Sequence, residues 1–385
     1  MNFIEKVKDG QKGKNVGLST GLKELDKFID GIQRKAIYGV AAAPKVGKTT
    51  FVDSCFVIEP FLYYLDYLQA FPDKPLRINW IYFSFEIDRV KKEMKYAAHF
   101  MARDHGVYNF MHKGIMYPMS QRYLEGKLTD DTDLDEAGHP KVIKLTPEHM
   151  EMLKQVYANR IIPLFGEYDA RGKKLKPGVI DFIEEKDNPT GLRNYLFRYA
   201  KENGEFNTED YSTLNDQGSK VTKSRITGYR PNNDSLYTII ITDHMRKLKR
   251  ERGFSMKDNM DKWIEYQVEL RNWCGFTFVD VVHLNRNLAN IERIRYLSEL
   301  LYPTGEDVKD SGNISEEADY LLTMFNPQDE KYGIKKHFGL DLADSSGKLM
   351  YPNYRSIHLV ESRDTECPAH MQVNMYGNIN AFQSI

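Results

Sequence analysis

The segment that most constrains the fold of this chain spans residues 37–57, with the sequence IYGVAAAPKVGKTTFVDSCFV. It reads as a short apolar strand, a tight turn and a helix that begins at the turn. A phosphate chain is bound by backbone N–H groups at a helix N-terminus, a closely approaching glycine, a lysine and a hydroxyl that holds Mg²⁺. Gly47, Lys48 and Thr49 supply the last three features. We therefore predict a P-loop, although Ala42 occupies the place of its first glycine; the alternative is a Gly-Lys-Thr that merely begins a surface helix.

Polar residues close three further strand-like runs. The run at 78–85 ends at Glu86, the strongly apolar run at 236–242 ends at Asp243, and the run at 276–284 contains His283 near its end. An apolar strand ending in Asp is typical of Walker B, whose carboxylate holds the Mg²⁺ shell, whereas the alternative is an Asp that caps the next helix. Strands that alternate with helices predict a mostly parallel α/β sheet with a site along one edge.

The remaining segments predict a helix over 22–29 capped by Ser19 or Thr20, a strand over 161–165, and late strands over 356–360 and 371–375 that could pair as a hairpin. Residues 1–16 read as an arm, and 17–385 as one domain with polar insertions near 115–147 and 203–234.

The acidic part of the first insertion, 129–141, resembles the start of a calcium loop at Asp131, Asp133 and Asp135. Glu136 stands where that loop needs glycine and Val142 where it needs a bidentate glutamate, so we expect a solvated loop without calcium.

Composition excludes several classes of protein. The formal net charge is −1, so any binding of nucleic acid must use a local basic patch. The three cysteines are far apart and lack metal-ligand spacing, which favours reduced thiols in a cytoplasmic setting and no zinc site. We find neither a signal peptide nor a membrane-spanning segment, because the most apolar run, 51–71, carries acidic residues and a proline.

In their order along the chain, these motifs resemble the RecA-type ATPase domain of DnaB-family replicative helicases. The resemblance rests on STGLKELDKFIDGIQ, AAAPKVGKTT, SFEID, ITDHMRK, HLNRN, DVKDSGNISEEAD and ESRDTECPA. Alanine commonly takes the first glycine position of this family's P-loop, so Ala42 agrees with the resemblance. It implies a RecA-like P-loop NTPase fold in a compact, phage-like form, because the family's N-terminal helical domain has no counterpart here.

The resemblance implies a site for ATP and Mg²⁺. Lys48 would bind the β- and γ-phosphates, Thr49 and Asp243 the metal, and Glu86 would polarise the attacking water. His283 falls where the family usually has a glutamine that senses the γ-phosphate, and its alternative role is that of a satisfied histidine at a strand end. The predicted nucleotide-binding residues are Ala43, Pro44, Lys45, Val46, Gly47, Lys48, Thr49, Thr50 and Asp243.

The resemblance also implies that Arg363 is an arginine finger that reaches the ATP of a neighbouring subunit, which requires a ring or filament. Glu361 replaces the lysine that usually precedes the finger by two residues. A primase or a helicase loader is a further implied partner.

Contacts with single-stranded DNA are expected on two basic loops, unless these charges simply face water. The candidate residues are Lys247, Lys249, Arg250, Arg252, Arg286, Arg293 and Arg295. The leading hypothesis is an ATP-driven hexameric helicase. The alternatives are a RecA-fold ATPase that binds single strands as a filament or loader without unwinding, and a ring ATPase whose DNA role has lapsed.

Overall fold

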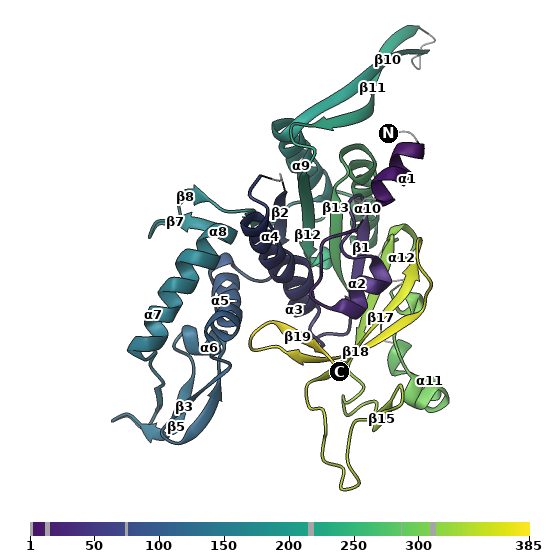
Figure 1. The fold of residues 1–385 in the computed structure, drawn as a ribbon. Helices are drawn as coiled ribbons and strands as arrows, with labels where there is room; N and C mark the ends of the chain where they lie inside the picture. The colour runs from purple at the N-terminus through teal and green to yellow at the C-terminus, as the bar shows by residue number, and fades with distance from the viewer. Residues whose placement is uncertain (1–2, 12–15, 74–75, 215–218, 286, 309–312) are drawn as a thin grey trace.

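A computed structural model describes residues 3–11, 16–73, 76–214, 219–285, 287–308 and 313–385. These residues form an α/β fold around one large sheet (Figure 1). The nine strands assigned to this sheet in the described chain are, in spatial order, β19 (Ala381–Ser384), β18 (Ala369–Tyr376), β17 (Tyr354–Ser362), β14 (Tyr320–Phe325), β1 (Ile37–Ala42), β13 (Thr277–His283), β12 (Leu236–Asp243), β2 (Arg77–Ser84) and β9 (Ile180–Ile183). The strands from β14 to β9 run parallel, and β17, β18 and β19 extend the sheet antiparallel. The predicted mostly parallel sheet and its late C-terminal hairpin are therefore confirmed.

Helices cover both faces of the sheet because alternate residues of the buried strands point to opposite sides. On one face lie α2 (Lys23–Ile29), α5 (Arg89–His105) and a continuous helix made of α3 (Lys48–Asp53), the π-helical turn η1 (Ser54–Ile58) and α4 (Glu59–Ala70). On the other face lie α9 (Pro189–Asn203), α10 (Met256–Cys274) and α12 (Ile314–Glu317). Along β1, Tyr38 and Val40 pack into the first layer, whereas Ile37 and Ala41 pack into the second.

Gly39 lies where β1 passes closest to the second layer. A Cβ atom there would lie 2.7 Å from Cδ1 of Leu321 and 3.1 Å from Cγ1 of Ile314, closer than packed carbon atoms tolerate. The strand that leads into the P-loop is thus held tightly between its neighbours.

Local signals set the ends of the long helices. The Asp88 carboxylate accepts a hydrogen bond from the Lys91 N–H at the start of α5. Ser255 and Asp258 form a reciprocal capping box at the start of α10, and Gly275 ends this helix in the left-handed region, at φ 70°.

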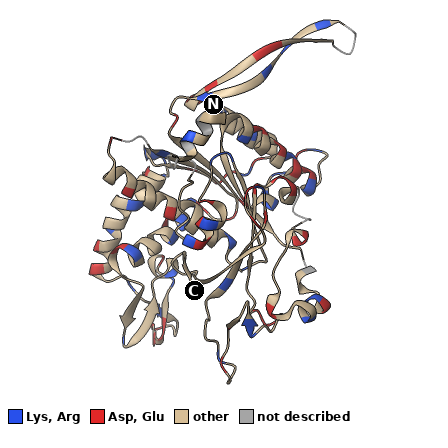
Figure 2. Cartoon of the chain, turned by 45° about the vertical axis from the view of Figure 1, so that its right-hand side comes forward, with Lys and Arg blue, Asp and Glu red and all other residues tan. Residues whose placement is uncertain are grey.

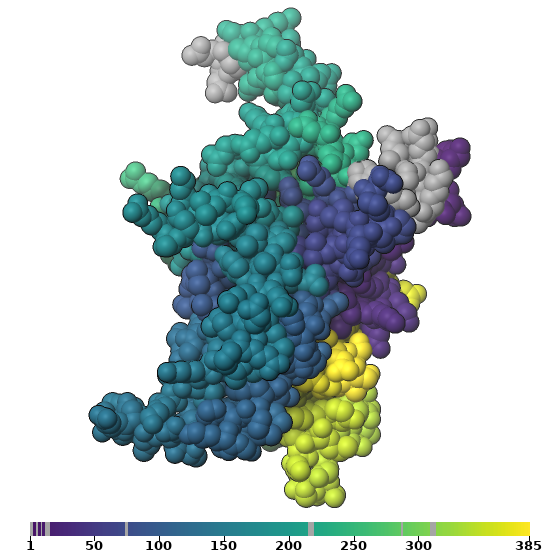
Figure 3. Space-filling view, turned by 60° about the vertical axis from the view of Figure 1, so that its left-hand side comes forward, coloured from purple at the N-terminus to yellow at the C-terminus, as the bar shows by residue number. Residues whose placement is uncertain are grey.

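The two polar insertions are ordered, which differs from our expectation of irregular loops. Residues 204–231 form a long hairpin, β10 (Gly204–Leu214) and β11 (Lys220–Pro231), that projects beyond the body of the molecule (Figures 1 and 3). At the opposite end, residues 109–142 form a lobe with two small hairpins (Figure 3). It contains β3 (Asn109–His112), β4 (Ile115–Pro118), α6 (Gln121–Leu124), β5 (Thr129–Leu134) and β6 (Pro140–Val142).

Two local predictions are wrong. Residues 161–165 are helical, as the end of η2 (Tyr157–Ile161) and as α8 (Ile162–Phe165), because Pro163 is tolerated in a first helical turn and a short apolar run fits a buried helix as well as a strand. Neither Ser19 nor Thr20 caps α2, which begins after Leu22; both hydroxyls instead donate to the Asp26 carboxylate, at 2.6 and 2.7 Å.

The shorter elements complete the chain. They are α1 (Phe3–Gln11), α7 (Pro147–Val156), β7 (Gly166–Tyr168), β8 (Lys174–Pro177), η3 (Met245–Lys247), η4 (Asn287–Ala289), α11 (Ile291–Leu297), η5 (Ser298–Leu300), η6 (Gly305–Asp307), β15 (Lys336–His337) and β16 (Leu340–Asp341). Within the described ranges, no helix is both long and apolar enough to cross a membrane.

Candidate functional site

The carboxyl ends of β1, β13, β12 and β2 meet at one edge of the sheet. The register places Ala42 beside His283 and Asp243 beside Ser84, two residues before Glu86. The polar residues that follow these strands therefore converge around one cleft of about 370 Å³. Its walls are Pro44, Lys45, Gly47, Lys48, Thr49, Thr50, Glu86, His244, Val281 and His283.

The turn after β1 has the backbone of a phosphate-binding loop. Gly47 has φ 116°, which L side chains rarely adopt, and a Cβ atom at this position would collide with the Met375 sulfur. The helix begins directly after it at Lys48, so the first N–H groups of α3 face the cleft without partners from a preceding turn. This arrangement favours an anion in the cleft.

Lys48 lies folded back over the loop. Its Nζ donates to the carbonyls of Ala42 and Ala43, at 3.0 and 3.3 Å, and lies 3.1 Å from Nδ1 of His283. Burial lowers the pKa of Lys48 to about 8, against the opposing effect of Asp243. A negatively charged ligand would compensate this cost and attract the ammonium group.

Two histidines line the cleft beside Lys48. The rings of His244 and His283 meet edge to face with centroids 4.1 Å apart. Burial, followed by the nearby Lys48 charge, lowers the pKa of His283 to about 4, and burial together with His283 lowers the pKa of His244 to about 3. Both rings are therefore neutral near pH 7, so each can offer one acceptor nitrogen and one donor.

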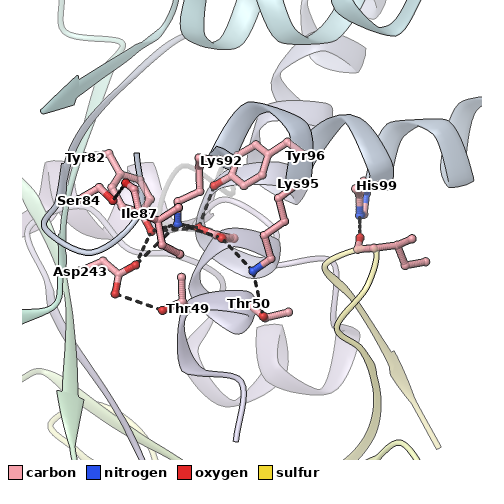
Figure 4. Close-up of polar contacts among 12 residues, drawn as sticks. Thr49, Thr50, Tyr82, Ser84, Ile87, Lys92, Lys95, Tyr96, His99 and Asp243 are labelled. Atoms are coloured by element: carbon pink, nitrogen blue, oxygen red, sulfur yellow. Dashed lines mark hydrogen bonds and ion pairs between the residues drawn. The ribbon is translucent and has the colours of Figure 1, made fainter. Parts of the chain in front are cut away.

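Thr49 and Asp243 meet at the floor of the cleft. The Thr49 hydroxyl donates to Oδ1 of Asp243 at 3.2 Å. Burial raises the pKa of Asp243, and the opposing charge of Lys92 lowers it. Oδ2 of the same carboxylate accepts a hydrogen bond from Tyr82 at 3.2 Å, and Lys92 Nζ lies 3.7 Å away (Figure 4).

Glu86 lies across the cleft from Thr49. Its side chain is about 42% exposed, and Oε1 is 3.6 Å from Nζ of Lys247. This is a loose surface pair, so the carboxylate is available to a solvent molecule in the cleft.

Arg363 lies at the opposite edge of the sheet. It follows β17, which runs antiparallel, and its N–H donates to the Asp319 carbonyl just before β14. Its guanidinium lies 3.6 Å from Glu317 and 3.8 Å from Asp319. The length of β1, roughly 20 Å at about 3.3 Å per residue, separates this edge from the P-loop, so Arg363 does not enter the cleft of its own chain.

The basic residues proposed for DNA lie in different surroundings. Lys247, Lys249, Arg250 and Arg252 are exposed on η3 and the loop that precedes α10, and Arg295 is exposed on α11. Arg293 holds the buried Asp307 carboxylate with two contacts, at 2.6 and 2.9 Å, and Arg286 lies outside the described residues. Basic and acidic residues are interspersed over the molecule (Figure 2).

Sequence reasoning missed three groups that border the cleft. Arg355 at the start of β17 donates from Nε to the Val46 carbonyl of the loop at 3.1 Å, and no motif marks it. Lys95 donates to the Thr50 hydroxyl at 3.3 Å. A signal existed for Lys95 and its neighbour Lys92, because polar residues recur at helical spacing on an otherwise apolar face of α5.

Comparisons with known proteins agree with this geometry at the level of the fold. No protein-family profile matches the chain, and no curated protein matches it in sequence. The solved ATPase domain of a DnaB-like helicase is similar over 99% of this chain and 97% of its own, with a TM-score of 0.55 and 11% identity. The fold is that of a RecA-like ATPase domain. A second DnaB-like replicative helicase, solved in a study of its interactions with primase, is similar over all of this chain and 68% of its own, with a TM-score of 0.59 and 11% identity.

Proposed function

We propose that this chain is an ATP-dependent, ring-forming DNA helicase that translocates on single-stranded DNA during replication. The observation that carries the proposal is the contact between Thr49 and Asp243 in one cleft with Lys48 and Glu86, at the carboxyl edge of a RecA-like sheet. The likeness to two solved helicase-related ATPase domains supports the choice of reaction.

The residues of the cleft fit a nucleotide with Mg²⁺. The hydroxyl of Thr49 and the carboxylate of Asp243 are hard oxygen donors of the kind that Mg²⁺ prefers, and the P-loop supplies backbone N–H groups and Lys48 for the phosphates. Their oxygens are 3.2 Å apart, close to the roughly 2.9 Å expected for neighbouring ligands of an octahedral ion with bonds of 2.0–2.1 Å. Thr49 and Asp243 would therefore hold the metal.

The reaction is phosphoryl transfer to water, in which positioning and charge neutralisation do most of the catalysis. Mg²⁺ supplies charge neutralisation between the phosphate oxygens when it is bound. Lys48 leaves the carbonyls of Ala42 and Ala43 and turns to the phosphates, while Glu86 orients the attacking water. Neutral His283, in contact with Lys48, donates a hydrogen bond to the terminal phosphate and so registers its presence.

The rest of the machinery lies between subunits. Arg363 would reach the nucleotide of a neighbouring copy, which agrees with its position at the far edge of the sheet. The N-terminal arm at 1–16, which includes the amphipathic helix α1, would pack on an adjacent subunit. The hexameric state, a primase or loader partner, a phage-like origin and a cytoplasmic location belong to the same proposal.

We propose that single-stranded DNA contacts the exposed basic loop formed by Lys247, Lys249, Arg250 and Arg252, together with Arg286 and Arg295. These contacts would use phosphates, so affinity should fall as salt increases. Arg293 is the weakest member of the predicted set because its guanidinium already holds Asp307.

Two measurements test the proposal. ATP hydrolysis should be stimulated by single-stranded DNA, and the chain should displace a strand from a forked duplex, whereas Lys48→Ala should abolish both activities. Stimulation without displacement would instead favour the RecA-fold ATPase that binds single strands without unwinding. Hydrolysis without stimulation would favour a ring ATPase whose role on DNA has lapsed.

A further inference from the structure

A buried polar cluster lies directly behind the candidate metal ligands. It joins Asp53 on α3, Tyr82 on β2, and Lys92 and Tyr96 on α5, and each of these four side chains is fully buried. Figure 4 shows Lys92 and Tyr82 between helix α5 and Asp243, with Thr49 on the far side of the Asp243 carboxylate. A cluster of this kind is costly to bury unless every member is hydrogen-bonded.

Asp53 and Lys92 form the centre of this cluster. Nζ of Lys92 donates to both oxygens of Asp53, at 2.9 and 3.1 Å, and to the Tyr82 hydroxyl oxygen at 2.8 Å. The Tyr96 hydroxyl also donates to Oδ1 of Asp53, at 2.9 Å. These contacts neutralise the pair and fix the position of the Tyr82 oxygen from behind.

The single proton of the Tyr82 hydroxyl can serve one of two carboxylates. Its oxygen lies 3.0 Å from Oδ1 of Asp53 and 3.2 Å from Oδ2 of Asp243. Asp53 is already satisfied by Lys92 and Tyr96, whereas Oδ2 of Asp243 gains a hydrogen bond from this hydroxyl. Because Lys92 occupies the acceptor side of the Tyr82 oxygen, the O–H is left to point at a carboxylate.

We propose that Tyr82, anchored by the Asp53–Lys92 pair, is a positioning residue that fixes the rotation of the Asp243 carboxylate. With Oδ2 tied to the interior, Oδ1 is presented to Thr49 and to a metal ion in the cleft. The inference deepens the proposed function, since it assumes that Thr49 and Asp243 hold Mg²⁺ together with a nucleotide. Groups that orient a metal ligand from behind typically contribute about 10- to 100-fold to metal affinity.

The chain offers a matched pair of variants. Tyr82→Phe and Tyr96→Phe each remove one buried hydroxyl that contacts Asp53, but only the Tyr82 hydroxyl also contacts Asp243. The assay is equilibrium binding of a fluorescent ATP analogue by the full-length chain, titrated with Mg²⁺ and repeated in EDTA. Thermal unfolding of each variant is measured alongside.

We expect Tyr82→Phe to raise the half-saturating Mg²⁺ concentration by about tenfold or more, with metal-free binding of the analogue unchanged. Tyr96→Phe should leave the Mg²⁺ requirement within about twofold of wild type while lowering thermal stability to a similar extent. An unchanged Mg²⁺ requirement in Tyr82→Phe, or an equal increase in both variants, would overturn the proposal. Failure of the wild-type chain to bind the analogue at any Mg²⁺ concentration is a different result, because it refutes the proposed function itself.

A second variant decides the question if Tyr82→Phe does not fold. The paired change Asp53→Asn with Lys92→Gln removes both buried charges at once and so leaves no uncompensated charge in the core. It loosens the anchor of Tyr82 without touching Asp243 or Thr49. We expect a shift of the Mg²⁺ requirement in the same direction, and an unchanged requirement would count against Tyr82 as a positioning residue.

Discussion

If Arg363 completes the site of a neighbouring subunit, two inactive variants should restore each other. Arg363→Ala should keep the fold, because its ion pairs with Glu317 and Asp319 are half-exposed contacts worth at most about 1 kcal/mol each. Its ATP hydrolysis should nevertheless fall by roughly 10³ to 10⁵, the usual contribution of an arginine finger. Lys48→Ala should be inactive because it loses phosphate binding in its own cleft.

The magnitude of the rescue follows from the geometry. Arg363 and Lys48 belong to opposite edges of the sheet, so a head-to-tail contact places Arg363 of one copy against the cleft of the next. In an equimolar random mixture, a site is complete when an Arg363→Ala copy with intact Lys48 meets a Lys48→Ala copy with intact Arg363. This arrangement occurs at about one site in four, so hydrolysis should recover to about a quarter of the wild-type rate if sites act independently.

The control is a mixture of Lys48→Ala with Asp243→Ala, two changes that damage the same cleft. This pair should give no recovery, because each copy lacks a residue that no neighbour can replace. Refolding the chains together and confirming mixed oligomers by mass spectrometry establishes that copies exchange. A mixture of Lys48→Ala and Arg363→Ala that forms mixed oligomers but stays inactive would refute the shared site.

Three further predictions concern assembly and stability. Gly39→Ala should destabilise the chain by about 1–3 kcal/mol through overpacking against Leu321, and urea unfolding should show a smaller combined loss with Leu321→Ala than the sum of the two single changes; strict additivity would contradict the clash. Burial lowers the pKa of His337 to about 4, so between pH 6.5 and 4 the unfolded chain binds a proton that the folded chain excludes, and stability should fall with pH in this window by up to about 3 kcal/mol. His337→Gln should reduce this slope in urea titrations, and an equal fall in both proteins would assign it to other groups. Deleting residues 1–15 should weaken the oligomer in sedimentation, whereas an unchanged oligomer would count against the arm as a subunit contact.

The cleft could be predicted from the sequence because its residues follow local rules. Glu86, Asp243 and His283 each stand at or just after the end of an apolar run, and parallel strands bring their carboxyl ends to the same edge. The P-loop was recognisable because Gly47, Lys48 and Thr49 are consecutive. The order of these motifs then predicted the fold as a whole.

Other features depend on contacts between distant residues and left little trace in the sequence. The cluster of Asp53, Tyr82 and Lys92 joins three elements, and none of these residues lies in a motif. The run at 161–165 was assigned to a strand because a short buried segment carries no periodicity that separates the two states. The insertion at 203–234 contains turn-forming and polar residues throughout, so its regular hairpin could not be told from a loop.

The contact between Arg355 and the P-loop has a consequence for the timing of synthesis. Arg355 holds the Val46 carbonyl across 309 residues of chain, and Met375 packs against Gly47 from the strand that follows. A ribosome that adds about 5–20 residues per second needs roughly 15–60 s to travel from one to the other. During that interval the nascent chain carries a P-loop without its supporting strands, so nucleotide binding becomes a property of the finished polypeptide, and a translation product truncated before β17 has no working copy of this site to contribute to an assembly.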